Sequence, residues 1–130
     1  MKFISRHWNP ADFPAMQCLA AAHPNDHLHV VDLPYRLSSW GLDDPANTCL
    51  WFRSSGELAA WAVLQLPFWT LDFTCDPALD AELLPLILAW ADDRARQLCT
   101  APWERECWFV NNFADQARRL SLLTAAGWMD

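Results

Sequence analysis

The stretch from residue 68 to residue 85, FWTLDFTCDPALDAELLP, decides the fold, because a strand pattern changes there into a helix pattern. Over residues 68–75 apolar and polar side chains alternate with a period of two, which is typical of a β-strand. The apolar face holds Trp69, Leu71, Phe73 and Cys75, and the other face holds Thr70, Asp72 and Thr74. We therefore expect a strand that is covered on its apolar face.

A helix is expected directly after this strand, over residues 80–98. Leu84, Leu88, Ala91 and Ala95 recur at helical spacing, and Asp80 is the expected N-cap. Corners between a strand and a helix often hold a phosphate, because the first N–H groups of a helix are unpaired. The question that the sequence raises is whether this corner holds one.

Outward from the corner, strand and helix patterns alternate along the whole chain. The strand–helix–strand unit of residues 68–110 should be parallel and right-handed, whereas the Ser-Ser-Gly turn of residues 54–56 indicates an antiparallel hairpin. We expect one α/β domain, residues 1–130, with a mixed sheet and helices on both faces. The expected order is β-α-α-β-β-β-α-β-α, over residues 3–6, 10–22, 28–40, 48–53, 57–66, 68–75, 80–98, 106–110 and 116–127, with Asn9 capping the first helix and Asp115 the last.

The composition excludes several classes of protein. A net charge of −7 and a pI near 4.8 argue against nucleic-acid binding, which needs a basic face. No apolar run is long enough for a membrane span, and the first residues lack the apolar stretch of a signal peptide. The five cysteines form no Cys-x-x-Cys spacing, so we expect reduced thiols and a cytoplasmic protein.

Three stretches resemble the GNAT acyltransferase superfamily: residues 48–77, the helix DAELLPLILAWADDRARQL of residues 80–98, and QARRLSLLTAAGW at residues 116–128. The last stretch is similar to the family's fourth-helix pattern Asn-x-x-Ala-hydrophobic-x-Leu-Tyr-x-x-x-Gly-Phe, with Gly127 and Trp128 in the Gly-Phe positions. The chain looks most like the degenerate first half of a tandem GNAT protein, and the family's last hairpin is missing from it.

The resemblance implies an N-acetyltransferase that uses acetyl-CoA to acylate a small amine. The strand edge at Phe73, Thr74 and Cys75 would then run along the pantetheine, and Asp72 would be the catalytic candidate, taking a proton or holding an ammonium group. The alternative reading of Asp72 is a solvated or arginine-paired carboxylate. Arg118 and Arg119 are expected on an exposed helix face, although a contact with cofactor phosphate is conceivable.

The corner departs from the family pattern. Active members carry glycines there, which let backbone N–H groups approach a pyrophosphate. Here Pro77 removes a donor, and Asp76, Asp80 and Glu82 place carboxylates where the phosphates would lie. Leu123 stands at the position of the tyrosine proton donor, and the only tyrosine, Tyr35, lies far off. We expect the corner to cap its own helix, which leaves two hypotheses: an acyltransferase with a degenerate cofactor site, or an inactive scaffold.

A partner is expected in either case. The strand of residues 106–110 would be an uncovered sheet edge, so a second GNAT domain or a second copy could pair with it. Nine tryptophans in so short a chain either fill the core or cover a partner surface, with Trp103 and Trp128 near this edge. A third hypothesis is a small-molecule module that uses a Trp-rich cleft.

A metal site is not favoured. His23, His27 and His29 lie close in sequence to Asp26 and Asp32, but their spacing does not place them on one helix face. Ordinary surface histidines are the expected reading. The core is expected to hold seven apolar side chains between sheet and helices: Trp61, Leu71, Phe73, Leu84, Leu88, Phe109 and Leu122.

Overall fold

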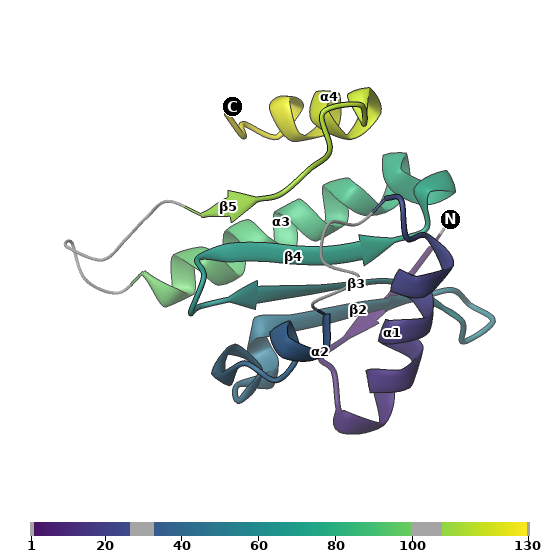
Figure 1. Ribbon diagram of the computed structural model, residues 1–130, viewed down its shortest axis with the longest axis vertical. Helices are drawn as coiled ribbons and strands as arrows, with labels where there is room; N and C mark the ends of the chain where they lie inside the picture. The colour runs from purple at the N-terminus through teal and green to yellow at the C-terminus, as the bar shows by residue number, and fades with distance from the viewer. Residues whose placement is uncertain (1, 27–32, 100–107, 130) are drawn as a thin grey trace.

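The computed structural model describes residues 2–26, 33–99 and 108–129, and within them the chain forms a five-stranded mixed sheet of order β1-β2-β3-β4-β5 (Figure 1). Strands β1 to β4 pair antiparallel in succession, whereas β5 pairs parallel with β4. The strands are β1 Ile4–Arg6, β2 Thr48–Phe52, β3 Leu58–Gln65, β4 Thr70–Cys75 and β5 Phe109–Val110. The structure therefore confirms a mixed sheet and the expected order of strands and helices.

Helices cover both faces of this sheet. α1 Phe13–Ala22 and α2 Leu33–Arg36 pack on one face, and α3 Asp80–Leu98 packs on the other with α4 Ala117–Ala125 beside it (Figure 1). Each face has its own cluster of buried apolar side chains. The alternation along the strands separates the two clusters, since neighbouring residues of a strand point to opposite faces.

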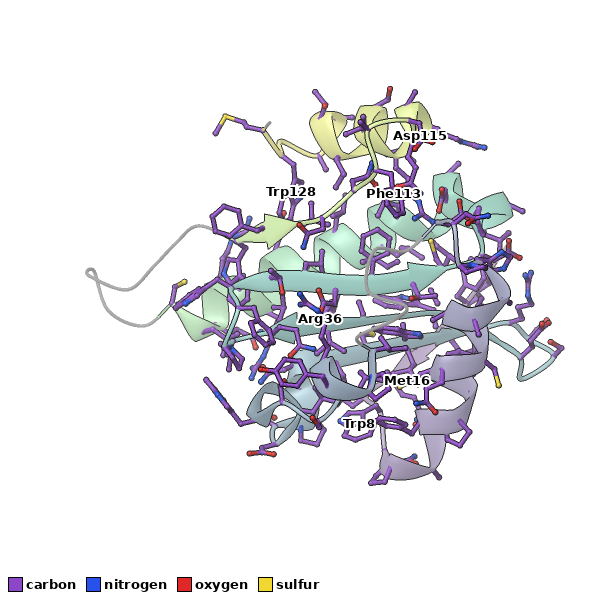
Figure 2. All side chains as sticks on the ribbon, in the orientation of Figure 1. Trp8, Met16, Arg36, Phe113, Asp115 and Trp128 are labelled. Carbon is purple, nitrogen blue, oxygen red and sulfur yellow. The ribbon has the colours of Figure 1, made fainter. Side chains whose placement is uncertain are left out.

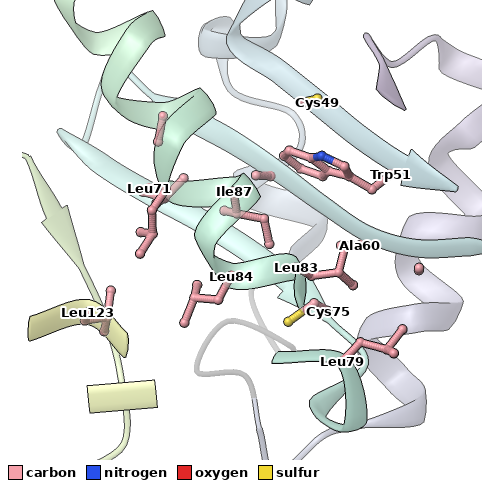
Figure 3. Close-up of a cluster of buried hydrophobic side chains, with 14 of the residues drawn as sticks. Cys49, Trp51, Ala60, Leu71, Cys75, Leu79, Leu83, Leu84, Ile87 and Leu123 are labelled. Carbon is pink, nitrogen blue, oxygen red and sulfur yellow. The ribbon is translucent and has the colours of Figure 1, made fainter. Parts of the chain in front are cut away.

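The core under α3 combines small strand residues with large helix residues. Ala60 and Ala62 of β3 are fully buried, which lets the leucines of α3 approach the sheet closely. Figure 3 shows Leu83, Leu84 and Ile87 packed over the strands with Leu71 and Cys75. Trp51 and Trp90 meet edge to face with ring centroids 6.1 Å apart, an arrangement that aromatic quadrupoles favour.

The core under α1 is built around Trp61. This side chain is 1% exposed, and its indole N–H donates to the carbonyl of Met16 at 3.0 Å. Trp61 therefore fills the α1 face of β3, and not the α3 face. The two clusters together correct the expectation of a single core between sheet and helices.

Among the seven expected core residues, Leu71, Leu84 and Leu88 are buried under α3 as predicted. Phe73 and Leu122 are half-buried at the margin of the same cluster. The prediction for Phe109 was wrong, because its side chain is 47% exposed. β5 is an edge strand in the described residues, so one side of Phe109 has no neighbouring strand to cover it.

Several helix boundaries differ from the expected ones. Asn9 caps the first turn as predicted, through its side-chain oxygen and the N–H of Ala11 at 2.9 Å. Asp115 does not cap α4, which begins at Ala117 after Gln116. Of the helix expected at residues 28–40, the structure shows only the turn of α2, and residues 27–32 lie outside the described part.

The turns around the sheet follow the local chemistry. Gly127 ends α4 with φ 91°, and the N–H of Trp128 returns to the carbonyl of Leu123. Trp69 also has a positive φ, 54°, so it belongs to the turn before β4 and not to the strand. In the described part of the chain no helix is long and apolar enough to cross a membrane.

Candidate functional site

The corner between β4 and α3 is closed by its own side chains. Asp76 caps a short 3-10 turn, Pro77–Leu79, by accepting the N–H of Ala78 at 3.0 Å. Its second carboxylate oxygen lies 3.0 Å from the guanidinium of Arg53 on the β2–β3 hairpin. The residue that caps this corner is thus Asp76, and the expectation that Asp80 is the N-cap was wrong.

Asp80 has a different partner. Its carboxylate binds the guanidinium of Arg119 at two points, with Nε to Oδ2 at 2.8 Å and Nη2 to Oδ1 at 2.9 Å. The two side chains are only 7% and 4% exposed. Arg119 therefore reaches from α4 to the first turn of α3 and neutralises the carboxylate at that helix terminus.

The remaining groups of Arg119 are also engaged. Nη1 donates to the carbonyl of Asp26 after α1 at 2.8 Å, and Nη2 lies 3.6 Å from Sγ of Cys75. The guanidinium carbon lies 5.5 Å from the ring centroid of Phe73. One side chain thus joins the turn after α1 to β4, α3 and α4. Burial alone would lower the pKa of Arg119, but the hydrogen bond and charge of Asp80 raise it, so the guanidinium stays protonated.

The Cys75 thiol completes the network. It lies 2.9 Å from Oδ1 of Asp80 and donates its proton there. Burial raises its pKa well above the ordinary value, and the negative charge of Asp80 raises it further. A thiol held in the neutral form is a poor nucleophile, so Cys75 acts as a packed hydrogen-bond donor.

Arg119 was expected on an exposed face, and the structure corrects this. The helical spacing contains a signal that points to the buried position: Arg119 lies three and four residues before Leu122 and Leu123, and residues at those separations share one helix face. Arg118, one residue earlier, is exposed as expected.

Asp72 lies on the opposite face of β4. Its carboxylate is 4% exposed and binds Nη1 of Arg36 from α2, at 2.9 Å from Oδ2 and 3.2 Å from Oδ1. The guanidinium of Arg36 also stacks over the ring of Phe68, with 4.9 Å to the centroid. This is the arginine-paired carboxylate that the alternative reading of Asp72 describes. Figure 2 shows Arg36 over the sheet on this face.

Polar side chains lie next to this ion pair. Gln65 donates to the carbonyl of Arg36 at 3.0 Å, and Ser39 donates to the side-chain oxygen of Gln65 at 2.5 Å. The exposed ring of Tyr35 lies 6.1 Å from that of Phe68, measured between ring centroids. The pairing orders α2 on the sheet, and it leaves Asp72 as an acceptor of arginine N–H groups.

The three residues expected to line a pantetheine do not point the same way. Phe73 and Cys75 face α3, whereas the side chain of Thr74 is buried on the α1 side. β5 pairs with β4 only at Thr70 and Leu71, so the backbone edge of residues 72–75 lies beyond that ladder. The guanidinium of Arg119 lies beside the side chains of Phe73 and Cys75 of this strand.

The other expected positions have structural roles. Leu123 is buried under α3, and Gln116 donates to the carbonyl of Asp26 at 3.1 Å. His27, His29 and Asp32 lie outside the described residues, as does Trp103. Within the described part, no group of three or more His, Cys, Asp or Glu side chains could hold a metal ion.

Comparison with known proteins adds no assignment: no protein-family model matches the chain, and neither does any curated protein.

Proposed function

We propose that this chain is a GNAT-like domain that does not bind acyl-CoA and serves as a scaffold, packing against a second GNAT domain or a second copy. The observation that carries the proposal is the buried Asp80–Arg119 pair at the start of α3. If the GNAT resemblance holds, this pair lies where the family cradles a pyrophosphate.

The energetics support a closed corner. Removing one partner of a buried ion pair costs about 3–5 kcal/mol, because the other charge is left unpaired. A cofactor that displaced Arg119 would lose that amount from its binding free energy, and micromolar affinity corresponds to only about −8 kcal/mol. The negative charge of Asp76 would also repel the phosphates. Its carboxylate already accepts the N–H of Ala78, so this donor is not available to a phosphate.

The family pattern supports the same reading. Where the fourth-helix pattern has alanine, counted from its Asn position at Gln116, this chain has Arg119. An alanine would leave the edge of β4 open beside Phe73, whereas the arginine fills it. A single large side chain would thus block the groove that the family leaves open.

Support for the GNAT fold itself comes from the order of strands and helices, which follows that of the family. That order supports the second candidate equally, acyl transfer from acetyl-CoA to a small amine near Asp72, because a fold does not fix a function. Arg36 opposes it, because its guanidinium already occupies the carboxylate that would have to bind the ammonium group.

A partner surface is part of the proposal. Phe109 at the sheet edge is 47% exposed, and Tyr35 and Trp40 are 68% and 59% exposed. Exposed aromatic side chains and an edge strand are common in protein interfaces. We also propose a cytoplasmic location, supported by the free cysteines Cys18, Cys49 and Cys75.

Calorimetric titration with acetyl-CoA tests the cofactor part. The expected result is no saturable heat for the native chain, and an Arg118→Ala variant should behave identically because Arg118 is exposed. Micromolar or tighter binding by the native chain would overturn the scaffold proposal and favour the acyltransferase.

Light scattering tests the partner part. A second copy predicts a mass above the 14.9 kDa of the chain that falls on dilution. A mass of 14.9 kDa at every concentration would exclude the homodimer and leave a second GNAT domain as the partner to be tested by co-expression.

A further inference from the structure

A cavity of about 660 Å³ lies between the C-terminal half of α3, the residue before β5 and the turn that follows α4. Its volume is within the range of small-molecule sites. Figure 2 shows Trp128 beside β5 at the end of α4. The walls include Ala91, Asp92, Arg96, Trp108 and Trp128. This cavity lies on the α3 side of the sheet, opposite Asp72.

Two irregularities meet at the cavity wall. Among the described side chains, the indole N–H of Trp108 is the one buried polar group without a hydrogen-bond partner. Its ring packs at 5.2 Å on that of Trp69, which has a left-handed φ of 54°. Both features cost stability, and folds keep such costs mainly where a site requires them. The indole N–H is a donor, so it would pair with an acceptor atom of a ligand and not with a cationic group. The cavity therefore differs from a simple packing gap.

The charges at the cavity favour a cation. Asp92 lines it and is half-buried, and in the described part of the chain its carboxylate has no ion-pair partner. The guanidinium of Arg96 is already paired with Asp93 at 3.2 Å, at the exposed rim. A carboxylate left unpaired beside an apolar wall attracts a positive ligand.

Two helix C-termini at the cavity also favour a cation. α3 ends at Leu98 and α4 ends at Ala125, and the residues that follow each of them, Cys99 and Ala126, line the cavity. The C-terminus of a helix carries partial negative charge, which stabilises cations nearby. The net charge of −7 adds a long-range attraction for cations.

The aromatic walls define the rest of the ligand. Trp108 and Trp128 supply two indole rings, and tryptophan is the side chain that best binds organic cations through its π face. We propose that this cavity binds an organic cation with an apolar body, such as a substituted or quaternary ammonium ion. Asp92 supplies the counter-charge, and the two tryptophans enclose the apolar part.

Titration with benzyltrimethylammonium tests the site. Binding is measured by calorimetry and by the NMR shifts of the indole N–H signals. Saturable binding is expected, with the signals of Trp108 and Trp128 shifting most. Benzyl alcohol and phenylacetate are the neutral and anionic controls, and each should bind at least tenfold more weakly. Equal binding of the three probes would overturn the proposal, and so would no saturation at millimolar concentration.

Two variants with the same change of charge give a matched comparison. Asp92→Asn should weaken the binding of the cation at least tenfold, whereas Asp43→Asn, at an exposed position outside the cavity lining, should alter it less than twofold. Trp128→Leu should also weaken binding, with circular dichroism confirming the fold. Equal effects of Asp92→Asn and Asp43→Asn would contradict the assignment of the cavity.

The site is independent of the proposed scaffold role. A quaternary ammonium ion has no N–H to acylate, so its binding reports nothing on acyl transfer. If the chain binds acetyl-CoA but also the cation, only the scaffold proposal fails. If the cation does not bind while acetyl-CoA is also excluded, only the cavity proposal fails.

Discussion

Asp80 and Arg119 lie 39 residues apart in the sequence, and their side chains form a two-point ion pair that fastens α4 to the first turn of α3. The pair is buried, and it also holds the Cys75 thiol and the carbonyl of Asp26. Its loss should therefore affect both the stability of the domain and the openness of the corner.

Replacing Arg119 alone should be strongly destabilising. Arg119→Met keeps much of the apolar volume but leaves the Asp80 carboxylate buried without a cation, which costs about 3–5 kcal/mol. Arg118→Met, on the exposed side of the same helix, should change the free energy of unfolding by less than about 0.5 kcal/mol. Urea denaturation measures both, and equal stabilities would contradict the burial of the pair.

Replacing both partners should restore part of that loss. In Asp80→Leu/Arg119→Met no charge is left unpaired, and apolar replacements of buried ion pairs are often neutral. The double variant should be more stable than Arg119→Met alone, with a coupling free energy above about 1 kcal/mol in a double-mutant cycle. Additive effects of the two substitutions would show that the side chains do not interact.

Two leucines of α3 distinguish its buried and exposed faces. Leu84 is fully buried, so Leu84→Ala should cost about 2–5 kcal/mol through lost apolar burial and the cavity it creates. Leu86 is 44% exposed, so Leu86→Ala should cost no more than about 1 kcal/mol. Thermal denaturation compares the two variants. A similar loss of stability at both positions would contradict the assignment of the buried and exposed faces of α3.

Buried thiols should resist labelling. Burial raises the pKa of Cys49 to about 11, and Cys75 is also raised by burial, so neither forms thiolate at pH 8. A variant with Cys18, Cys99 and Cys107 replaced by serine should react with a thiol reagent only after denaturation. Rapid labelling of the native variant would contradict this prediction.

Acid should remove the contribution of the Asp12 carboxylate to the stability of the fold. The hydrogen bond from Arg6, at 2.7 Å, holds the pKa of Asp12 below its ordinary value near 3.8. The carboxylate therefore stabilises the fold above the unfolded pKa, and this contribution is lost as pH falls through the lower folded value. Asp12→Asn should be less stable than the native chain at pH 7, and the difference should shrink below pH 4, as urea titrations at both pH values would show.

The sequence by itself determined the local elements. Alternation along residues 70–75 was enough for β4 and its two faces, and Gly127 marked the end of α4, because both depend on local backbone geometry. The acidic, glycine-free sequence of the corner also predicted that the corner caps its own helix, since helix capping involves residues only a few positions apart.

Only the tertiary structure decided which side chains meet. Arg118 and Arg119 are adjacent and chemically identical, yet one is exposed and the other is buried against Asp80, because α4 presents only one face to α3. Trp61 lies under α1 and Phe109 at an edge for the same kind of reason: burial depends on which elements pack on each strand. Periodicity identifies the faces of an element, whereas contacts between residues far apart in sequence determine what covers each face.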